Sequence, residues 1–507
     1  MDMIMTDTEL SQKKSEEKKN GISPSSPADI AVDERRLSLY KGLLPIFSIE
    51  QVVETLKKIP EAERENTFVF CDMNYLFRAA DMVRPLGFPG LLPTQADREM
   101  ESDRQAAKDF VKTYYPDLKV AETQEYKQIQ EAIDFLTTTQ ECWVLKGNDP
   151  DAKTVVPTSD NPSNCAKELT EALSKHKDKY ESAGFILERK ICNALEITPQ
   201  IVFWDGKPVY TDVDIELKKK GAGNFGPVTG CAANLVFPTE LKDTINDYAF
   251  PPKIYQLATL HKGQFIFDAS ILIDPQTGDR YFGEYCANRQ GWDATQTEIE
   301  LAGGVKNYFG SIMNGLNPFD SITAQAGVAI RIFSPHQDDE FPKTPKAGVE
   351  MFIAPSIEDH TWMLDATMND EGCMTTAGYM EDVAVITAAA ETYEQAIDQV
   401  YSYLDSFSFD SFEVRPKFDM LSREYPDSIP NRYLYGKWSM YMVDIGCAFS
   451  MTVDPIVDRQ FDMERQKMKA EFSDKVVLMQ REYDLRLRQQ MDMVRKQVQE
   501  IIDNGKA

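Results

Sequence analysis

Two acidic residues on neighbouring predicted strands could bind a divalent metal ion. Asp268 lies in the apolar run IFDASIL, and Glu284 lies in YFGEYCANR, sixteen residues later. The turn sequence PQTGD between them predicts a hairpin, which would bring both carboxylates toward one point near the turn. Carboxylate oxygens held in this way suit Mg²⁺. The alternative is that the two residues are half-exposed strand carboxylates without a ligand.

A run of three lysines precedes a glycine-rich loop. Lys218, Lys219 and Lys220 lead into the sequence GAGNFGPVTG, which ends at Thr229 and Gly230. Backbone amides of such a loop, with ammonium groups beside them, can bind a phosphate or a carboxylate. The alternative is that this stretch is the charged tip of a hairpin.

Within that loop, GAGNFG matches the dinucleotide-binding pattern G-x-G-x-x-G. The pattern requires a helix to begin there, so that the helix N-terminus faces a pyrophosphate. The following PVTGCAANLVFP is short and bounded by prolines, so we do not predict a dinucleotide site.

Two further charged residues lie near the ends of predicted strands. Lys146 ends the apolar run ECWVLK, and Glu188 follows the apolar residues of FILERKI. The ammonium of Lys146 either extends from an apolar surface to water or points at a ligand phosphate. The carboxylate of Glu188 could accept a hydrogen bond from a nucleotide ribose or order a purine.

These groups need strands and helices to position them, and the hydrophobic pattern predicts both. The predicted strands cover 66–74, 141–148, 184–191, 199–217, 264–287, 327–334, 349–355, 361–367 and 383–390. The predicted helices cover 49–59, 75–87, 103–115, 164–180 and 392–407. The mixture indicates an α/β and α+β fold, with turns at WDGKP and PQTGD.

The order of these elements divides the chain into six predicted segments. They are a disordered tail (1–33), an N-terminal α/β domain (34–92), a central α+β domain (93–324), a C-terminal α+β domain (325–425), a connection (426–458) and a long amphipathic helix (459–507). Residues 459–502 contain neither Gly nor Pro, and their apolar residues form one stripe at helical spacing. This helix either packs on its own domain or mediates self-association or binding of a protein partner.

Composition excludes several classes of protein. The chain of 507 residues has a formal net charge of −27, which disfavours nucleic-acid binding, and no apolar run is long enough to span a membrane. The eight cysteines are scattered without a C-x-x-C pair, as in a reduced cytoplasmic protein. The four histidines do not pair at metal-binding spacing, which argues against a zinc hydrolase.

The order of the motifs resembles the ATP-grasp superfamily and, within it, phosphoribosylamine–glycine ligase (glycinamide ribonucleotide synthetase). That family carries D-H-K-R, then a glycine- and acid-containing stretch, then G-P-N-T-G-G. Here ELKK leads to GPVTG with the same length, so Lys218 and Lys219 fall on the Lys-Arg pair. Thr229 and Gly230 fall on the Thr-Gly pair, and the likeness covers roughly 66–416.

Further matches lie upstream of the glycine-rich loop. Arg104 falls on the lysine of the family's E-G-S-K helix, and Lys146 falls on the lysine that ends the next strand. Lys153 lies near the lysine of the family's glycine-rich phosphate loop. Glu188 and Glu196 match acidic residues on the adenine side of the nucleotide.

The resemblance implies an ATP-grasp fold with a truncated N-terminal α/β domain, a small C-terminal α+β domain and a long C-terminal helix. ATP and Mg²⁺ are the implied cofactors. The residues implied in ATP binding are Arg104, Lys146, Lys153, Glu188 and Glu196, and those implied in Mg²⁺ binding are Asp268, Glu284 and Asn288.

The implied activity is a carboxylate–amine ligation, in which ATP activates a carboxylate as an acyl phosphate that an amine then attacks. Lys218, Lys219, Thr229 and Gly230 would face the carboxylate substrate. The implied substrates are small molecules, glycine and phosphoribosylamine, as in purine biosynthesis. One alternative is an ATP-grasp ligase with changed substrates. Another alternative is a diverged ATP-grasp scaffold that binds a nucleotide or a partner without catalysis. Cys286, which replaces the family's metal-binding Asn, and the added C-terminal helix favour this alternative.

Overall fold

The computed structural model describes residues 4–5, 39–41, 43, 46–115, 118–147, 154–274, 277–288, 292–334, 346–409, 412–422 and 428–433. The chain divides into two compact units, Met1–Met451 and Thr452–Ala507, and every described residue belongs to the first. The predicted helix over 459–507 therefore lies outside the described residues. Of the predicted tail over 1–33, only β1 (Ile4–Met5) is described, and it pairs in parallel with β2 (Ile46–Phe47).

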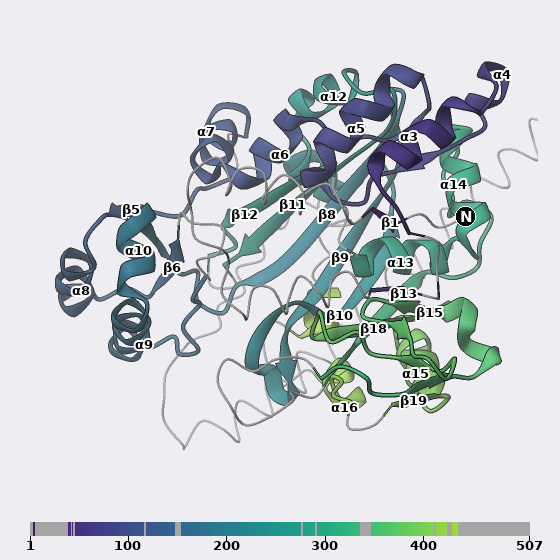
Figure 1. The fold of residues 1–507 in the computed structure, drawn as a ribbon. Coiled ribbons are helices and arrows are strands. Elements are labelled where there is room, and N and C mark those ends of the chain that lie inside the picture. Colours follow the sequence, from purple (N-terminus) through teal and green to yellow (C-terminus); the bar gives the residue numbers. More distant parts are fainter. Residues whose placement is uncertain are drawn as a thin grey trace, which may run out of the picture. The chain divides into compact units, whose positions relative to one another are not determined.

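A ten-stranded mixed sheet organises the first unit (Figure 1). Its strands are β3 (Val69–Phe70), β4 (Gly90–Leu91), β8 (Leu195–Trp204), β9 (Lys207–Gly221), β10 (Phe225–Thr239), β11 (Gly263–Ile273), β12 (Arg280–Ala287), β13 (Ala326–Phe333), β15 (Thr361–Met363) and β18 (Asp382–Ala390). They lie in the order β15-β18-β13-β10-β9-β8-β11-β4-β3, and β12 pairs with β11. Strands from the three predicted domains thus form one continuous sheet.

The predicted hairpins are present at the centre of this sheet. β8 and β9 pair in antiparallel fashion around Asp205 and Gly206, whose φ angles of 46° and 74° are those of a tight turn. β11 and β12 also pair in antiparallel fashion, as PQTGD predicts. GAGNFG lies in the turn η3 (Ala222–Asn224) and the start of β10, so a strand follows it and not a helix.

Strand β9 separates apolar from charged side chains because successive residues point to opposite faces of a sheet. Val213, Ile215 and Leu217 are fully or almost fully buried in the main hydrophobic core. The alternate residues are charged, and they place a row of polar groups on the other face of the sheet. That row is Asp212, Asp214, Glu216, Lys218 and Lys220.

The N-terminal strands join the sheet through two glycines. β4 runs parallel to both β3 and β11, and Gly263 pairs with Gly90. A Cβ atom at Gly263, whose φ is +88°, would lie 2.6 Å from the backbone nitrogen of Gly90. Only glycine permits this close approach, so the junction between β4 and β11 depends on Gly263.

A smaller lobe carries the predicted nucleotide-side residues. Its three-stranded sheet contains β5 (Thr123–Tyr126), β7 (Phe185–Arg189) and β6 (Trp143–Gly147), and all pairs are antiparallel. Its helices are α8 (Ile129–Thr138), α9 (Pro162–Lys175) and α10 (Lys177–Ala183), which lie beside this sheet in Figure 1. Leu145, Leu169 and Phe185 are fully buried in its own hydrophobic core.

Helices cover the large sheet, and several begin at the capping residues that the sequence supplies. Asp103 accepts hydrogen bonds from the backbone of Gln105 and Ala106 and so starts α7 at the predicted position. Helix α13 packs against β10, β13 and β18 on the charged face. The remaining helices are α3 (Ile49–Lys57), α4 (Glu61–Arg64), α5 (Phe77–Val83), α6 (Gln95–Ser102), α7 (Arg104–Tyr114), α11 (Thr244–Ala249), α12 (Pro252–Ala258), α13 (Trp292–Leu301), α14 (Val305–Met313), α15 (Tyr393–Leu404) and α16 (Lys417–Leu421).

Short elements complete the described part of the chain. They are the strand pairs β14 (Met351–Ile353) with β19 (Phe407–Phe409) and β16 (Thr367–Met368) with β17 (Met374–Thr375), and the 3₁₀ helices η1 (Asn74–Leu76), η2 (Arg84–Leu86) and η4 (Pro355–His360). Among the described residues, none of the helices is long and apolar enough to cross a membrane.

Candidate functional site

Lys218 lies among three carboxylates near the end of β9. Its Nζ atom is 2.8 Å from Glu196 Oε1, 3.6 Å from Glu216 Oε2 and 3.8 Å from Glu284 Oε1. Burial alone would lower the pKa of Lys218, but the three carboxylates raise it well above its usual range. The ammonium group therefore stays protonated.

Glu196 connects this lysine to the next strand. Its Oε1 atom also accepts a 2.6 Å hydrogen bond from Ser270 Oγ on β11. Burial alone would raise the pKa of Glu196, but Lys218 and then Ser270 lower it to about 2. The carboxylate is therefore ionised at neutral pH. We call Lys218, Glu196, Glu216, Ser270 and Glu284 the Lys218 cluster.

The two predicted metal ligands lie on one face of the β11–β12 hairpin. Ser270 is opposite Glu284 and Asp268 is opposite Cys286, so Asp268 and Glu284 are diagonal neighbours. The Glu284 side chain is 65% exposed, whereas Asp268 is 9% exposed. The structure thus brings these two carboxylates together as the hairpin predicts, with a thiol beside them.

Asn288 is not part of this arrangement. Its Oδ1 atom accepts a hydrogen bond from the backbone of Ile266, and its Nδ2 atom donates to Asp97 at 3.1 Å and lies 3.0 Å from His261 Nδ1. The side chain is fully buried, and the φ angle of 50° turns the chain after β12. In the part of the chain that the structure describes, no three His, Cys, Asp or Glu side chains are arranged to hold a metal ion.

Glu188 in the smaller lobe binds two lysines, one of them on α7. Lys146 Nζ donates to Glu188 Oε1 at 2.5 Å, and Lys108 Nζ lies 2.5 Å from Glu188 Oε2. Lys108 also donates to Thr123 Oγ1. Burial alone would raise the pKa of Glu188, but Lys146 and then Lys108 lower it. We call Lys108, Lys146 and Glu188 the Glu188 cluster.

Lys108 was not among the residues that the sequence singled out. It lies on α7, and its side chain is only 7% exposed, like the adjacent apolar positions Ala107 and Val111. A lysine within the apolar stripe of an amphipathic helix was the available signal, since a buried ammonium needs a counter-ion. The counter-ion itself lies 80 residues further along the chain and could not be identified from local spacing.

Two predicted phosphate-binding residues cannot be placed. Lys153 lies outside the described residues. Arg104 is the first residue of α7, and its side chain lies outside the described part of the structure.

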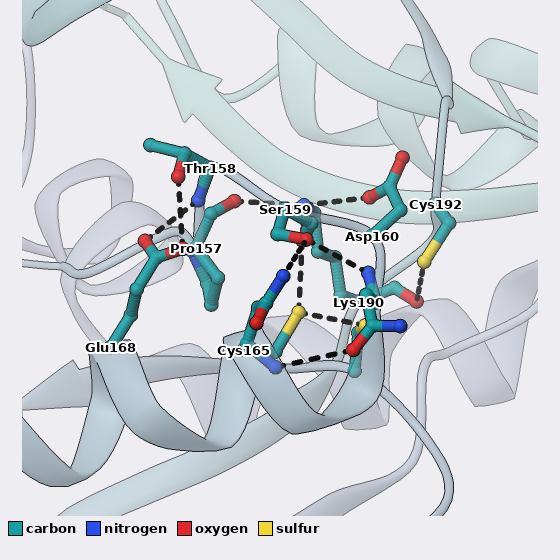
Figure 2. Close-up of polar contacts among 11 residues, drawn as sticks. Pro157, Thr158, Ser159, Asp160, Cys165, Glu168, Lys190 and Cys192 are labelled. Carbon is teal, nitrogen blue, oxygen red and sulfur yellow. Dashed lines mark hydrogen bonds and ion pairs between the residues drawn. The ribbon is translucent and has the colours of Figure 1, made fainter.

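The chain that follows Lys153 is firmly held in the smaller lobe (Figure 2). Lys190 Nζ donates to the backbone oxygen of Ser159 at 3.0 Å and lies 2.8 Å from Asp160 Oδ1. Glu168 on α9 accepts hydrogen bonds from the backbone and hydroxyl of Thr158. Lys190 and Glu168 therefore hold the segment from 158 to 160 in one place in the smaller lobe.

The residues matched to the substrate loop lie beside the Lys218 cluster. Thr229 Oγ1 donates to the backbone oxygen of Lys218 at 3.0 Å. A Cβ atom at Gly230 would lie 3.5 Å from Nη1 of Arg331, a buried cation on β13. Lys219 is the next residue after Lys218 along β9, so its side chain points to the opposite face of the sheet. The structure thus places Thr229 against the backbone of Lys218 and Gly230 beside Arg331, while the side chain of Lys219 points away from that of Lys218.

Buried acids extend the charged row of β9 beneath α13. Gln200 Nε2 donates to Glu298 Oε1 at 2.5 Å, and Tyr210 OH donates to Glu298 Oε2 at 2.8 Å. Burial and then Glu298 raise the pKa of Asp212 well above its usual range. Burial and then Glu216 raise the pKa of Asp214 in the same way. The alternation in TDVDIELKKK was the sequence signal for this row.

Comparison with known proteins identifies the fold. No family model matches the sequence, and no curated protein matches it. Phosphoribosylamine–glycine ligase from Thermotoga maritima is similar in structure, with a TM-score of 0.54 and 16% identity over 73% of this chain and 88% of that chain. This likeness shows the ATP-grasp fold that the sequence predicts.

Two further solved structures are more distantly similar. The biotin carboxylase domain of 2-oxoglutarate carboxylase from Hydrogenobacter thermophilus, in complex with MgADP, ADP and bicarbonate, has a TM-score of 0.49 and 14% identity over 77% of this chain and 85% of that chain. Phosphoribosylglycinamide synthetase from Anaerococcus prevotii has a TM-score of 0.43 and 14% identity over 80% of this chain and 98% of that chain.

Proposed function

We propose that this ATP-grasp chain is an ATP-dependent carboxylate–amine ligase that works through an acyl phosphate. The observation that carries the proposal is the position of Lys218 among Glu196, Glu216 and Glu284 on the charged face of the sheet. A protonated lysine beside carboxylates that can share a metal ion is suited to stabilise a phosphoryl group during transfer.

On the nucleotide side, we propose that the Glu188 cluster binds ATP phosphates. The carboxylate of Glu188 pairs with both Lys108 and Lys146. A polyphosphate carries more charge and more acceptor oxygens, so it can compete for either ammonium group. Arg104 and Lys153 are assigned to the same role from the sequence alone, and Glu196 is assigned to nucleotide binding by the sequence resemblance alone.

The donor chemistry of Asp268 and Glu284 fits Mg²⁺. Two hard carboxylate oxygens on one hairpin face, together with phosphate oxygens and waters, are the ligands that Mg²⁺ takes in nucleotide sites. Mg²⁺ bound there would neutralise charge on the phosphates. Because the Asn288 amide is bound elsewhere, we leave it out of the proposed metal site.

Lys218 has the clearest role among the residues of this chain in the proposed reaction. Because its pKa is raised well above the usual range, it acts as a fixed positive charge and not as a base. It would orient the carboxylate substrate and stabilise the oxygen charges of the acyl phosphate. Thr229, which donates to the backbone of Lys218, and Gly230 would contact the same substrate.

More specifically, the sequence motifs support glycine and phosphoribosylamine as substrates, as in purine biosynthesis. One observation favours the second candidate function, a scaffold that binds a nucleotide or partner without catalysis. Cys286 is opposite Asp268 where the family has a metal-binding Asn, and a thiol is a poor ligand for Mg²⁺.

The test is a calorimetric titration of ATP into the purified chain, with and without Mg²⁺. The ligase proposal expects Mg²⁺-dependent binding, followed by ADP release when suitable carboxylates and amines are supplied together. ATP binding without ADP release over a broad substrate panel would favour the scaffold. Absence of binding in both titrations would contradict a nucleotide site of either kind.

A further inference from the structure

The segment that follows α15 contacts the strands of the Lys218 cluster. Its described parts, 412–422 and 428–433, lie mostly beyond the region of family likeness, which ends near residue 416. Ile429 and Ser428 are fully buried. The Tyr433 ring packs edge-on against Phe237 with centroids 5.0 Å apart and also contacts Tyr393. This segment is therefore anchored in the main hydrophobic core.

Arg432 links strands β8 and β9 beside the Lys218 cluster. Its Nη1 atom donates to the backbone oxygen of Glu196 at 3.1 Å, and its Nη2 atom donates to the backbone oxygen of Glu216 at 2.8 Å. The side chain lies in the interior, because Arg432 is only 3% exposed. One planar guanidinium thus holds the backbone of both residues whose carboxylates flank Lys218.

The bridge occurs where the ladder between β8 and β9 stops. The paired residues of these strands extend from Trp204 opposite Lys207 to Thr198 opposite Asp214. Beyond Thr198, no residue of β8 pairs with β9, although Glu196 still pairs with Leu272 of β11 on the other edge of β8. The two Nη donors of Arg432 take the place of the backbone hydrogen bonds that are missing between β8 and β9 here. They therefore set the spacing between the two strands at this point.

A second pair of residues holds β9 on the other side of Lys218. Arg415 Nη1 donates to the backbone oxygen of Lys219 at 2.6 Å, and Asp419 Oδ1 accepts a 3.0 Å hydrogen bond from the backbone of Gly223. Arg415 and Asp419 also form a buried ion pair with each other. The backbone around Lys218 is therefore held by the C-terminal segment at three carbonyls and one amide.

We propose that Arg432 is a positioning residue, which sets the distance between Glu196 and Glu216 and thereby holds Lys218 in place for its anionic ligand. Only the catalytic consequence rests on the proposed function, since the bridge is a property of the fold. Loss of the guanidinium would let β8 and β9 separate and would release Lys218 from the carboxylates on either side.

The test measures how fast acetic anhydride acetylates Lys218. The folded full-length chain is labelled briefly and then digested, and mass spectrometry of the peptides gives the rate at each lysine. Lys207, which is exposed at the other end of β9, serves as the internal reference. Arg432→Gln should raise the rate at Lys218 relative to Lys207 by about tenfold, as expected when a charge-assisted hydrogen bond is lost. Tyr433→Leu is the matched control, because it disturbs the same segment without touching either carbonyl.

The proposal is overturned if Arg432→Gln leaves the relative rate unchanged, or if Tyr433→Leu raises it equally. If Arg432→Gln does not fold, the same measurement is made on Arg432→Lys. Its ammonium keeps the buried charge but cannot reproduce the planar fork, so we expect a smaller rise, and no rise would overturn the proposal. A wild-type chain that fails to bind Mg·ATP would contradict the proposed function and leave this comparison valid.

Discussion

Glu196 on β8 and Lys218 on β9 form an ion pair, with 2.8 Å between Oε1 and Nζ. The pair lies where β8 and β9 cease to be paired, so it adds a side-chain link that the backbone ladder does not provide. Because each residue changes the protonation of the other, this link can be measured as a dependence of stability on pH.

Glu196→Gln should lower the free energy of unfolding at pH 7 by about 2–3 kcal/mol. The pKa of Glu196 is lowered from 4.5 to about 2, so its contribution is complete above pH 4.5 and is lost as the pH falls toward 2. Urea unfolding at several pH values measures the difference. Glu171→Gln, on the exposed surface of α9, is the control. A difference that grows below pH 4.5 would contradict the ion pair.

Glu188→Gln should lower the free energy of unfolding by about 3 kcal/mol, because it leaves the ammonium groups of Lys108 and Lys146 without a common counter-ion. Lys146→Met should cost less, since Glu188 would still bind Lys108. If the Glu188 cluster binds phosphates, ATP should raise the melting temperature of Glu188→Gln more than that of the wild type. Equal rises in melting temperature for both proteins would contradict phosphate binding by the Glu188 cluster.

Glu284→Ala should abolish Mg²⁺-dependent ATP hydrolysis while leaving the melting temperature within about 2 °C of the wild type, as for other exposed substitutions. The reason is that the Glu284 side chain is 65% exposed and contributes little to packing. Asp279→Ala, on the same hairpin, is the matched control and should retain hydrolysis. Unchanged hydrolysis in Glu284→Ala would end the proposed role of this residue.

Asp212→Asn should stabilise the chain at pH 8 by on the order of 1–2 kcal/mol. Because burial and Glu298 raise the pKa of Asp212, the folded chain holds this proton more tightly than the unfolded chain, and wild-type stability falls as the pH rises. The gain should therefore shrink between pH 8 and pH 5. Asp109→Asn, exposed on α7, should show no such trend. A larger gain at pH 5 than at pH 8 would contradict the prediction.

Deletion of 459–507 should reduce the number of chains in each particle in solution without changing ATP affinity. The sequence predicts that this segment is an amphipathic helix, which either packs on its own domain or mediates self-association or binding of a protein partner. Light scattering of the full and shortened chains measures the mass. Identical oligomeric states for the two chains would exclude self-association through this segment.

The sequence predicted many of the individual elements because their signals are local, but it missed strand β10 and helices α8, α13 and α14. The apolar runs and the turn sequences WDGKP and PQTGD identified β8 with β9 and β11 with β12, and the helix predicted over 103–115 corresponds to α7. Asn288 shows the limit of this reasoning. Its spacing from Glu284 suggested a metal ligand, but the positive φ angle at Asn288 ends the regular strand and directs the amide toward Asp97.

Contacts between distant residues could not be predicted from local patterns. Arg432 contacts the backbone of Glu216, which lies 216 residues earlier in the chain. Lys108 and Glu188 are in different elements, and nothing in either segment specifies the other as its partner. Such pairs depend on how whole strands and helices pack, which is settled by the summed burial of many apolar side chains.

The continuous sheet also governs how the chain can be divided for expression. A fragment ending at residue 324 would lack β13, which pairs with β10 in the intact protein. The bared backbone of β10 would then be an open edge, able to pair with another copy and cause aggregation. Fragments designed at sequence-predicted boundaries would therefore behave worse than the whole chain, and useful truncations should spare every strand from β3 to β18.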